Sequence, residues 1–140
     1  MIKLLWNTHN QKKINETDDR EFVWGKYHKK NSDKWIFEIL TKVNFKEIKN
    51  ESELEKNDYL LIIDSNVVNK IDFYDKLKLI CSKIYLIHLG DETGINDHSE
   101  IYKNCNYVWR TFCSNTYFKN QKVSCIPLGY KSGVVINEEV

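Results

Sequence analysis

The sequence has few of the residues and motifs that mark several common classes of protein. Of its 140 residues, one is proline and five are glycine. Neither G-x-G-x-x-G nor G-x-x-x-x-G-K-[ST] occurs, so the dinucleotide-binding and P-loop motifs are lacking. The four cysteines include no C-x-x-C pair, which argues against zinc ribbons and thioredoxin-type sites. Basic and acidic residues number 21 and 20, without the basic excess typical of nucleic-acid-binding proteins.

Long apolar segments are also missing. No apolar run approaches the ~20 residues of a transmembrane helix, and the start, MIKLLWNTHNQKK, becomes polar too soon for a signal peptide. The sequence therefore predicts a soluble, cytoplasmic protein without a membrane segment. A reduced intracellular compartment is the simplest interpretation of cysteines without a C-x-x-C pair or regular spacing. Because Cys81 and Cys125 lie in apolar runs, we expect both to be small core hydrophobes.

Short apolar runs alternate along the chain with patterns of helical period. The runs predict strands at 2–6, 45–48, 59–63, 84–89, 107–112 and 123–126. Helical patterns cover 33–43, 51–56, 71–82 and 99–104, and the polar stretch 9–33 is expected to be a long loop. Unbroken apolar strands alternating with helices are typical of an α/β fold. We therefore predict one Rossmann-like domain with an open, mostly parallel sheet and flanking helices.

The predicted strand 84–89 leads into His88-Leu89-Gly90-Asp91-Glu92, at the strand end where parallel sheets bind ligands. A carboxylate held there can take a proton from a substrate hydroxyl. Asp91 and Glu92 are therefore candidate catalytic residues, and His88 and Gly90 are candidate substrate-binding residues. The alternatives are an acidic turn or helix cap for the carboxylates, and a hydrogen-bonded core histidine for His88.

Arginine is scarce, and one of the two arginines, Arg110, lies near the end of the predicted strand 107–112. A guanidinium can bind phosphate or carboxylate through two hydrogen bonds. Arg110 is therefore a candidate substrate-binding residue that contacts an anion or pairs with Asp91 or Glu92. The alternative is a surface arginine stacked on Trp109.

Two further motifs carry candidate substrate-binding residues. The turn I-P-L-G-Y-K-S-G follows the last predicted strand, and its exposed amides, with Gly129, Tyr130 and Lys131, suit an anion or a sugar. Trp24 belongs to an aromatic cluster that can stack on a sugar. A generic turn and an aromatic anchor of the loop are the alternatives. The spacing of the histidines does not favour a metal site.

In their order along the chain, these motifs resemble a known family. W-G-K comes before the first amphipathic helix, and a buried strand and a helix that contains F-Y follow it. Next come a strand that ends in H-L-G-D-E, a strand that contains W-R, and the turn I-P-L-G-Y-K-S-G. From about Trp24 to Val134 this order is similar to the N-terminal domain of the ribitol xylosyltransferase family. It resembles more loosely the exostosin-like glycosyltransferases, which share a strand-end H-L-x-D/E and a P-L-G turn.

The resemblance implies a GT-B architecture, in which two Rossmann-like domains face each other across a cleft. Residues 1–133 would be the N-terminal, acceptor-side domain, and 134–140 would begin a linker to a C-terminal domain missing from this chain. The complete enzyme would transfer a sugar from a nucleotide sugar such as UDP-xylose to a glycan or phosphopolyol hydroxyl. It would need no metal or other cofactor, because protein cations and helix N-termini stabilise the leaving diphosphate. The chain alone is expected to be inactive.

Two other interpretations stay open. The chain can be a non-catalytic α/β binding or interaction module. It can also be a small flavodoxin-like regulator, which is disfavoured because neither a phosphate-binding turn nor an acidic pair follows the first predicted strand.

Overall fold

The structure is a computed structural model that describes residues 1–7, 43–64, 67–90, 97–112 and 120–126. The chain divides into two compact units, and the first, residues 1–9 and 45–127, contains every helix and strand described below. The loop expected over 9–33 and nearly all of the helix expected over 33–43 lie outside the described residues.

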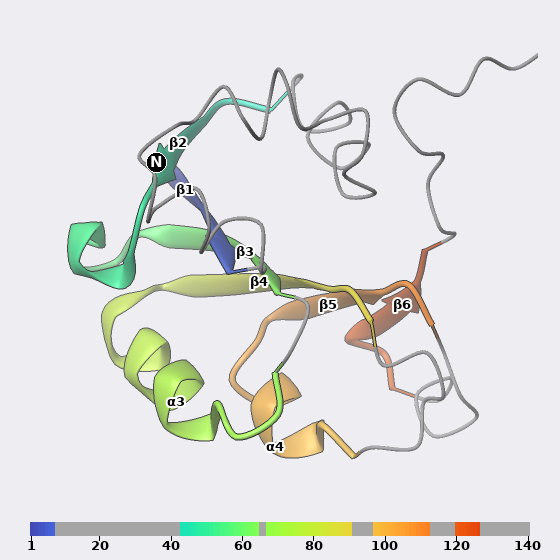
Figure 1. Ribbon diagram of the computed structural model, residues 1–140. Coiled ribbons are helices and arrows are strands. Elements are labelled where there is room, and N and C mark those ends of the chain that lie inside the picture. The colour runs from blue at the N-terminus through green and yellow to red at the C-terminus, as the bar shows by residue number, and fades with distance from the viewer. Residues whose placement is uncertain (8–42, 65–66, 91–96, 113–119, 127–140) are drawn as a thin grey trace, which may run out of the picture. The chain divides into compact units, whose positions relative to one another are not determined.

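The first unit is built on a six-stranded parallel sheet (Figure 1). Its strands are β1 (Ile2–Asn7), β2 (Phe45–Ile48), β3 (Tyr59–Asp64), β4 (Lys83–His88), β5 (Tyr107–Arg110) and β6 (Val123–Cys125). All pairings are parallel. The predicted α/β fold with an open, parallel, Rossmann-like sheet is therefore confirmed.

The strand order is β2-β1-β3-β4-β5-β6. The chain adds β2 on one side of β1 and all later strands on the other side. The point where this direction changes therefore lies between β1 and β3. In doubly wound sheets, ligands bind beyond the carboxyl ends of the strands at such a switch point.

Two helices, α3 (Ile71–Ile80) and α4 (Ser99–Tyr102), cover the same face of the sheet (Figure 1). Tyr74 and Leu77 of α3 are fully buried, and Phe73 and Ile80 pack against the core with part of their surface exposed. This is the apolar stripe predicted from the helical period. The same core cluster contains buried side chains of the central strands, Leu60, Ile62, Ile84, Leu86 and Val108.

The turn between β2 and β3 is η2 (Glu51–Glu53), a single turn of 3₁₀ helix. The Asn50 side chain accepts a hydrogen bond from Ser52 N, and the Glu53 side chain accepts one from Asn50 N in return. This reciprocal cap stabilises a turn too short to be stable alone. The short helical segment predicted in this region is confirmed.

The cysteines differ partly from expectation. Cys81 is buried, as predicted, and Cys81 and Cys105 are free thiols. Cys125 is exposed and disulfide-bonded, so its assignment to the core is wrong. The physical reason is that, among the described strands, β6 pairs with β5 alone and so lies at an edge of the sheet. In the part of the chain that the structure describes, no helix has the length and apolar character to span a bilayer.

Candidate functional site

Polar side chains form a row across the carboxyl ends of four neighbouring strands. The strand register places Asn7 beside Asp64, Asp64 beside His88, and His88 beside Arg110. The last three are 0%, 2% and 0% exposed. Burying charged or polar groups costs several kcal/mol unless partners compensate. The partners of each residue therefore decide what the row can do.

Asp64 is the acceptor for three side chains. Its carboxylate accepts hydrogen bonds from Lys70 Nζ at 2.8 Å, Tyr74 Oη at 2.9 Å and Asn7 Nδ2 at 3.1 Å. Lys70 and Tyr74 are four residues apart at the start of α3, so they lie on the same side of the helix. Burial, and after it the charge of Asp64, raises the pKa of Tyr74 well above its ordinary value of 10.0. Asp64 thus joins β1, β3 and α3 at the switch point of the sheet.

His88 and Arg110 share a partner, Tyr102 of α4. Tyr102 Oη is 2.5 Å from His88 Nδ1 and accepts a hydrogen bond of 2.5 Å from Arg110 Nη1. The guanidinium also lies 5.7 Å from the centre of the Tyr102 ring, and its Nε donates to Phe112 O at 2.7 Å. The Tyr102 hydroxyl has one proton to donate, so it can donate to His88 Nδ1 while His88 keeps its own proton on Nε2.

These contacts bear on two of the alternatives given above, while substrate binding by His88 stays a prediction. His88 is a hydrogen-bonded core histidine, as that alternative predicts. The alternative of a surface arginine on Trp109 is wrong, because Arg110 is fully buried and lies over Tyr102. Sequence reasoning did not anticipate this burial, because the partner belongs to α4, on a different element. A direct contact of Arg110 with an anion stays a prediction.

His98, at the start of α4, extends this cluster. Its ring packs edge to face on His88, with 5.0 Å between ring centres, and also lies near Tyr102. Among the described residues, no group of three or more His, Cys, Asp or Glu side chains is arranged to hold a metal ion. The two histidines are instead part of an aromatic cluster beneath the carboxyl edge.

The backbone after β4 turns sharply at the candidate motif. Leu89 N donates to Asp64 O at 2.8 Å, which holds the end of β4 against β3. Gly90 follows with a φ of 88°, a left-handed conformation that a Cβ atom would disfavour by ~1 kcal/mol or more. In the sequence, Gly90 directly precedes Asp91 and Glu92.

The structure thus brings three predicted site residues, His88, Gly90 and Arg110, to one edge of the sheet. The other predicted site residues, Trp24, Asp91, Glu92, Gly129, Tyr130 and Lys131, lie outside the described residues.

Sequence reasoning missed the contacts of Asp64 with Asn7, Lys70 and Tyr74, and it missed Tyr102 as the partner of His88 and Arg110. Part of a signal is present: an aspartate ends the apolar run Y-L-L-I-I-D, and a lysine and a tyrosine follow with the spacing of one helical turn.

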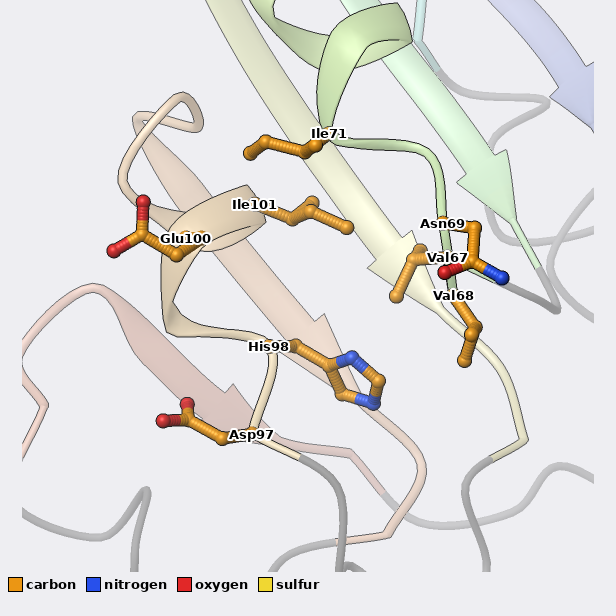
Figure 2. Close-up of a pocket in the computed structure, with 8 residues that line it drawn as sticks. All are labelled: Val67, Val68, Asn69, Ile71, Asp97, His98, Glu100 and Ile101. Atoms are coloured by element: carbon orange, nitrogen blue, oxygen red, sulfur yellow. The ribbon is translucent and has the colours of Figure 1, made fainter.

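A cavity of about 320 Å³ is lined in part by His98 (Figure 2). It is bordered on one side by the segment leading into α3 and on the other by the start of α4. Among the described residues, those that line it are Val67, Val68, Asn69, Ile71, Asp97, His98, Glu100 and Ile101. Its described lining thus comes from the segment that follows β3 and from the start of α4.

Comparison of the chain with protein-family models, with curated protein sequences and with solved structures finds no match.

Proposed function

We propose that the chain is the acceptor-side domain of a glycosyltransferase that transfers a sugar from a nucleotide sugar to a hydroxyl group. The proposal is supported mainly by the residues at the carboxyl end of β4. There a buried, hydrogen-bonded His88 and a left-handed Gly90 lead directly into two carboxylates of the sequence. Parallel α/β sheets bind ligands beyond this end of their strands.

In the proposed reaction, Asp91 or Glu92 is the general base. The carboxylate takes the proton of the acceptor hydroxyl while that oxygen attacks the anomeric carbon, and the nucleoside diphosphate leaves with the bonding electrons. A positioned base of this kind contributes ~10²–10⁴-fold to the rate. The donor binds mainly to a second domain, and no metal is required in this proposal.

The buried residues act by positioning. His88 and Arg110 are hydrogen-bonded to the same Tyr102 hydroxyl, so β4, β5 and α4 are held together where the chain enters the candidate motif. Because the end of β4 is held in place, the carboxylates that follow it can occupy fewer positions. Misplacement of a catalytic base by ~1 Å can lower the rate by ~10²-fold.

Ligand binding by the chain itself tests the proposal. We would follow backbone amides by NMR while adding xylose, ribitol and ribitol 5-phosphate in turn. At least one is expected to shift the amides of Leu89, Gly90 and Thr111, which follow β4 and β5. Lys83, at the opposite end of β4, is the internal control. If none of the three compounds shifts the amides after β4 and β5, the acceptor-domain proposal is wrong.

Substitution tests the base. In a longer version of the chain that transfers sugar, Asp91→Asn or Glu92→Gln is expected to lower kcat by ~10²–10⁴-fold while acceptor binding is retained. Near-normal transfer by both variants would contradict the assignment of the base.

One observation favours a second candidate, an α/β binding module without catalysis. Asp64, His88 and Arg110 are buried and hydrogen-bonded, as expected of polar groups whose only role is structural. This module would keep its fold and bind a protein or small ligand, but neither carboxylate variant would change any transfer reaction.

A further inference from the structure

We propose that Cys125 forms a reversible disulfide with Cys113, and that this bond ties the end of β6 to the segment that follows β5, next to Arg110. The β5–β6 edge of the sheet would then respond to the redox state of its surroundings. This redox sensitivity is independent of the proposed glycosyltransferase function.

The partner of Cys125 follows from elimination. The chain has four cysteines, and Cys125 is disulfide-bonded. Cys81 and Cys105 are free thiols, and both are buried. The remaining cysteine of the sequence is Cys113, which lies outside the described residues. Within this chain, Cys113 is therefore the partner.

The contacts of Arg110 independently agree with this pairing. The strand register pairs Arg110 with Cys125, and Ile126 N donates a hydrogen bond to Arg110 O at 2.7 Å. Arg110 Nε also donates to Phe112 O at 2.7 Å, and Phe112 directly precedes Cys113 in the sequence. Arg110 thus contacts the residue that follows one cysteine and the residue that precedes the other.

The disulfide is accessible to thiols in solution, because Cys125 is exposed. A thiolate of the reductant attacks Cys125 Sγ, the S–S bond breaks, and Cys113 leaves as a thiolate that takes a proton. A second reductant thiol then attacks the mixed disulfide, which releases Cys125 as a thiol and one reductant disulfide. Overall, two electrons and two protons pass to the protein. Oxidation by glutathione disulfide is the reverse reaction.

The two free cysteines do not compete for this bond. Burial raises the pKa of Cys81 to about 11 and the pKa of Cys105 to about 12. Exchange with a disulfide requires a thiolate, so both cysteines stay unreactive thiols near neutral pH while they are buried. The disulfide therefore forms and breaks between the same two residues.

Reduction is expected to loosen the part of the fold that contacts Arg110. Among the described strands, β6 pairs with β5 alone, and it has three residues. A cross-link between residues 12 positions apart restricts the separation of this edge from β5, because it constrains the chain between them. Without the cross-link, the hydrogen bond from Ile126 N to Arg110 O should break more often.

The first test measures which cysteines pair and whether the bond is reversible. The full chain is equilibrated in oxidised or reduced glutathione, free thiols are alkylated with iodoacetamide in denaturant, and peptide mass spectrometry gives the alkylated fraction of each cysteine. Cys113 and Cys125 should be protected together in oxidised glutathione and become alkylated together within ~1 hour in reduced glutathione. Cys81 and Cys105 should be alkylated in both.

Two kinds of result would overturn the proposal at this stage. Alkylation of Cys125 in oxidised glutathione would contradict the pairing, as would its protection by another cysteine or by glutathione itself. A bond that resists reduced glutathione, and that opens only with dithiothreitol in denaturant, would be purely structural and would contradict the reversible role.

The second test follows the edge of the sheet in the two redox states. Hydrogen exchange of the Ile126 amide, measured by NMR on the full chain, should be at least ~10-fold faster after reduction. The Ser82 amide, which donates to Asp58 O at 2.9 Å near the amino ends of β3 and β4, is the internal control. Its exchange should change by less than ~2-fold.

Substitution separates the disulfide from other effects of the reductant. Cys125→Ser changes an exposed position, so the chain should fold, and its Ile126 amide should exchange as in the reduced chain with or without dithiothreitol. Ser124→Ala, at the neighbouring position of β6, keeps both cysteines and should keep the redox response. Equal exchange of the Ile126 amide in the oxidised and reduced chains, or a redox response that persists in Cys125→Ser, would show that the disulfide does not control this edge.

Discussion

The two ends of β3 carry the same pair of residue types, an aspartate and a lysine, in different surroundings. At the amino end, Lys3 Nζ lies 3.4 Å from Asp58 and 3.9 Å from Glu55. At the carboxyl end, Lys70 Nζ lies 2.8 Å from Asp64, which also accepts from Tyr74 and Asn7 within 3.1 Å. Asp58 is 9% exposed, and Asp64 is fully buried.

The difference between the two ends of β3 indicates which of the two aspartates contributes more to the stability of the fold. The amino-end pair lies beside the η2 turn, and Asp58 also caps Glu55 N at 2.8 Å. Its contacts are long, and one acidic partner, Glu55, is mostly exposed to solvent. The carboxyl-end cluster instead joins two strands and a helix around Asp64, whose side chain is fully buried. Equal substitutions should therefore have unequal effects at the two ends.

Replacement of Asp64 is expected to have the largest effect. In Asp64→Ala, Tyr74 and Asn7 lose a buried acceptor, and the expected loss in free energy of unfolding is ~3–5 kcal/mol, measured by urea denaturation. The matched control is Asp72→Ala, an exposed position in the first turn of α3, with an expected change below ~1 kcal/mol. Similar losses in both variants would show that the buried Asp64 contributes no more to stability than the exposed Asp72.

Alkaline pH should lower the free energy of unfolding through Tyr74, at the carboxyl end of β3. Its pKa is raised in the folded state, so its contribution to stability is complete below pH ~10 and declines as pH rises from there toward the folded pKa. The expected slope is about 1.4 kcal/mol per pH unit in the free energy of unfolding. Urea denaturation from pH 8 to 11 should show a shallower decline for Tyr74→Phe than for the unsubstituted chain; equal slopes would contradict the assignment.

Removal of the amino-end cation should cost less. Lys3→Met leaves Asp58 with its hydrogen bond from Glu55 N and with partial access to solvent. We expect a loss of ~1–2 kcal/mol in free energy of unfolding, below the loss in Asp64→Ala. Lys83→Met, at an exposed position that begins β4, is the control for a lost lysine. A loss as large as that in Asp64→Ala would remove the distinction between the two ends.

The smallest predicted effect is on a thiol near the amino end. Burial, and after it the charge of Asp58, raises the pKa of Cys81 to about 11. Asp58→Asn should lower this pKa, increase the thiolate fraction and speed alkylation of Cys81 by iodoacetamide at pH 8 by ~2–5-fold. Peptide mass spectrometry measures the rate at each cysteine.

Cys105 is the internal control in the same molecule. Its pKa is raised to about 12, chiefly by burial, without a contribution from Asp58. Its alkylation rate should therefore not change. Equal acceleration at both cysteines would point to general opening of the structure and not to the charge of Asp58.

Much of the sheet was predictable because its central strands are buried on both faces. The run 59–63 predicted a strand that the structure extends by one residue, to Asp64, and the run 84–89 corresponds to β4. The helix predicted over 71–82 corresponds to α3, since its apolar residues recur with helical period. Strand order was not predictable, because a parallel crossover of given length can place the next strand on either side.

The site was less predictable because its residues depend on partners distant in the sequence. The burial of Arg110 depends on Tyr102, which belongs to α4. Asp64 looks in the sequence like a polar residue that ends a strand, and only the fold places Asn7 beside it. The exposure of Cys125 follows from the edge position of β6, which the local apolar pattern does not encode.

The placement of β1 between β2 and β3 has a consequence for how the molecule assembles. The Asn7–Asp64 hydrogen bond joins residues 57 positions apart, whereas β3 and β4 are connected through one short helix. Loop-closure entropy must be lost before such distant pairings form, and topologies dominated by them fold slowly. β1 is thus the strand whose pairings span the longest stretches of sequence, and β3, β4 and β5 can pair without it.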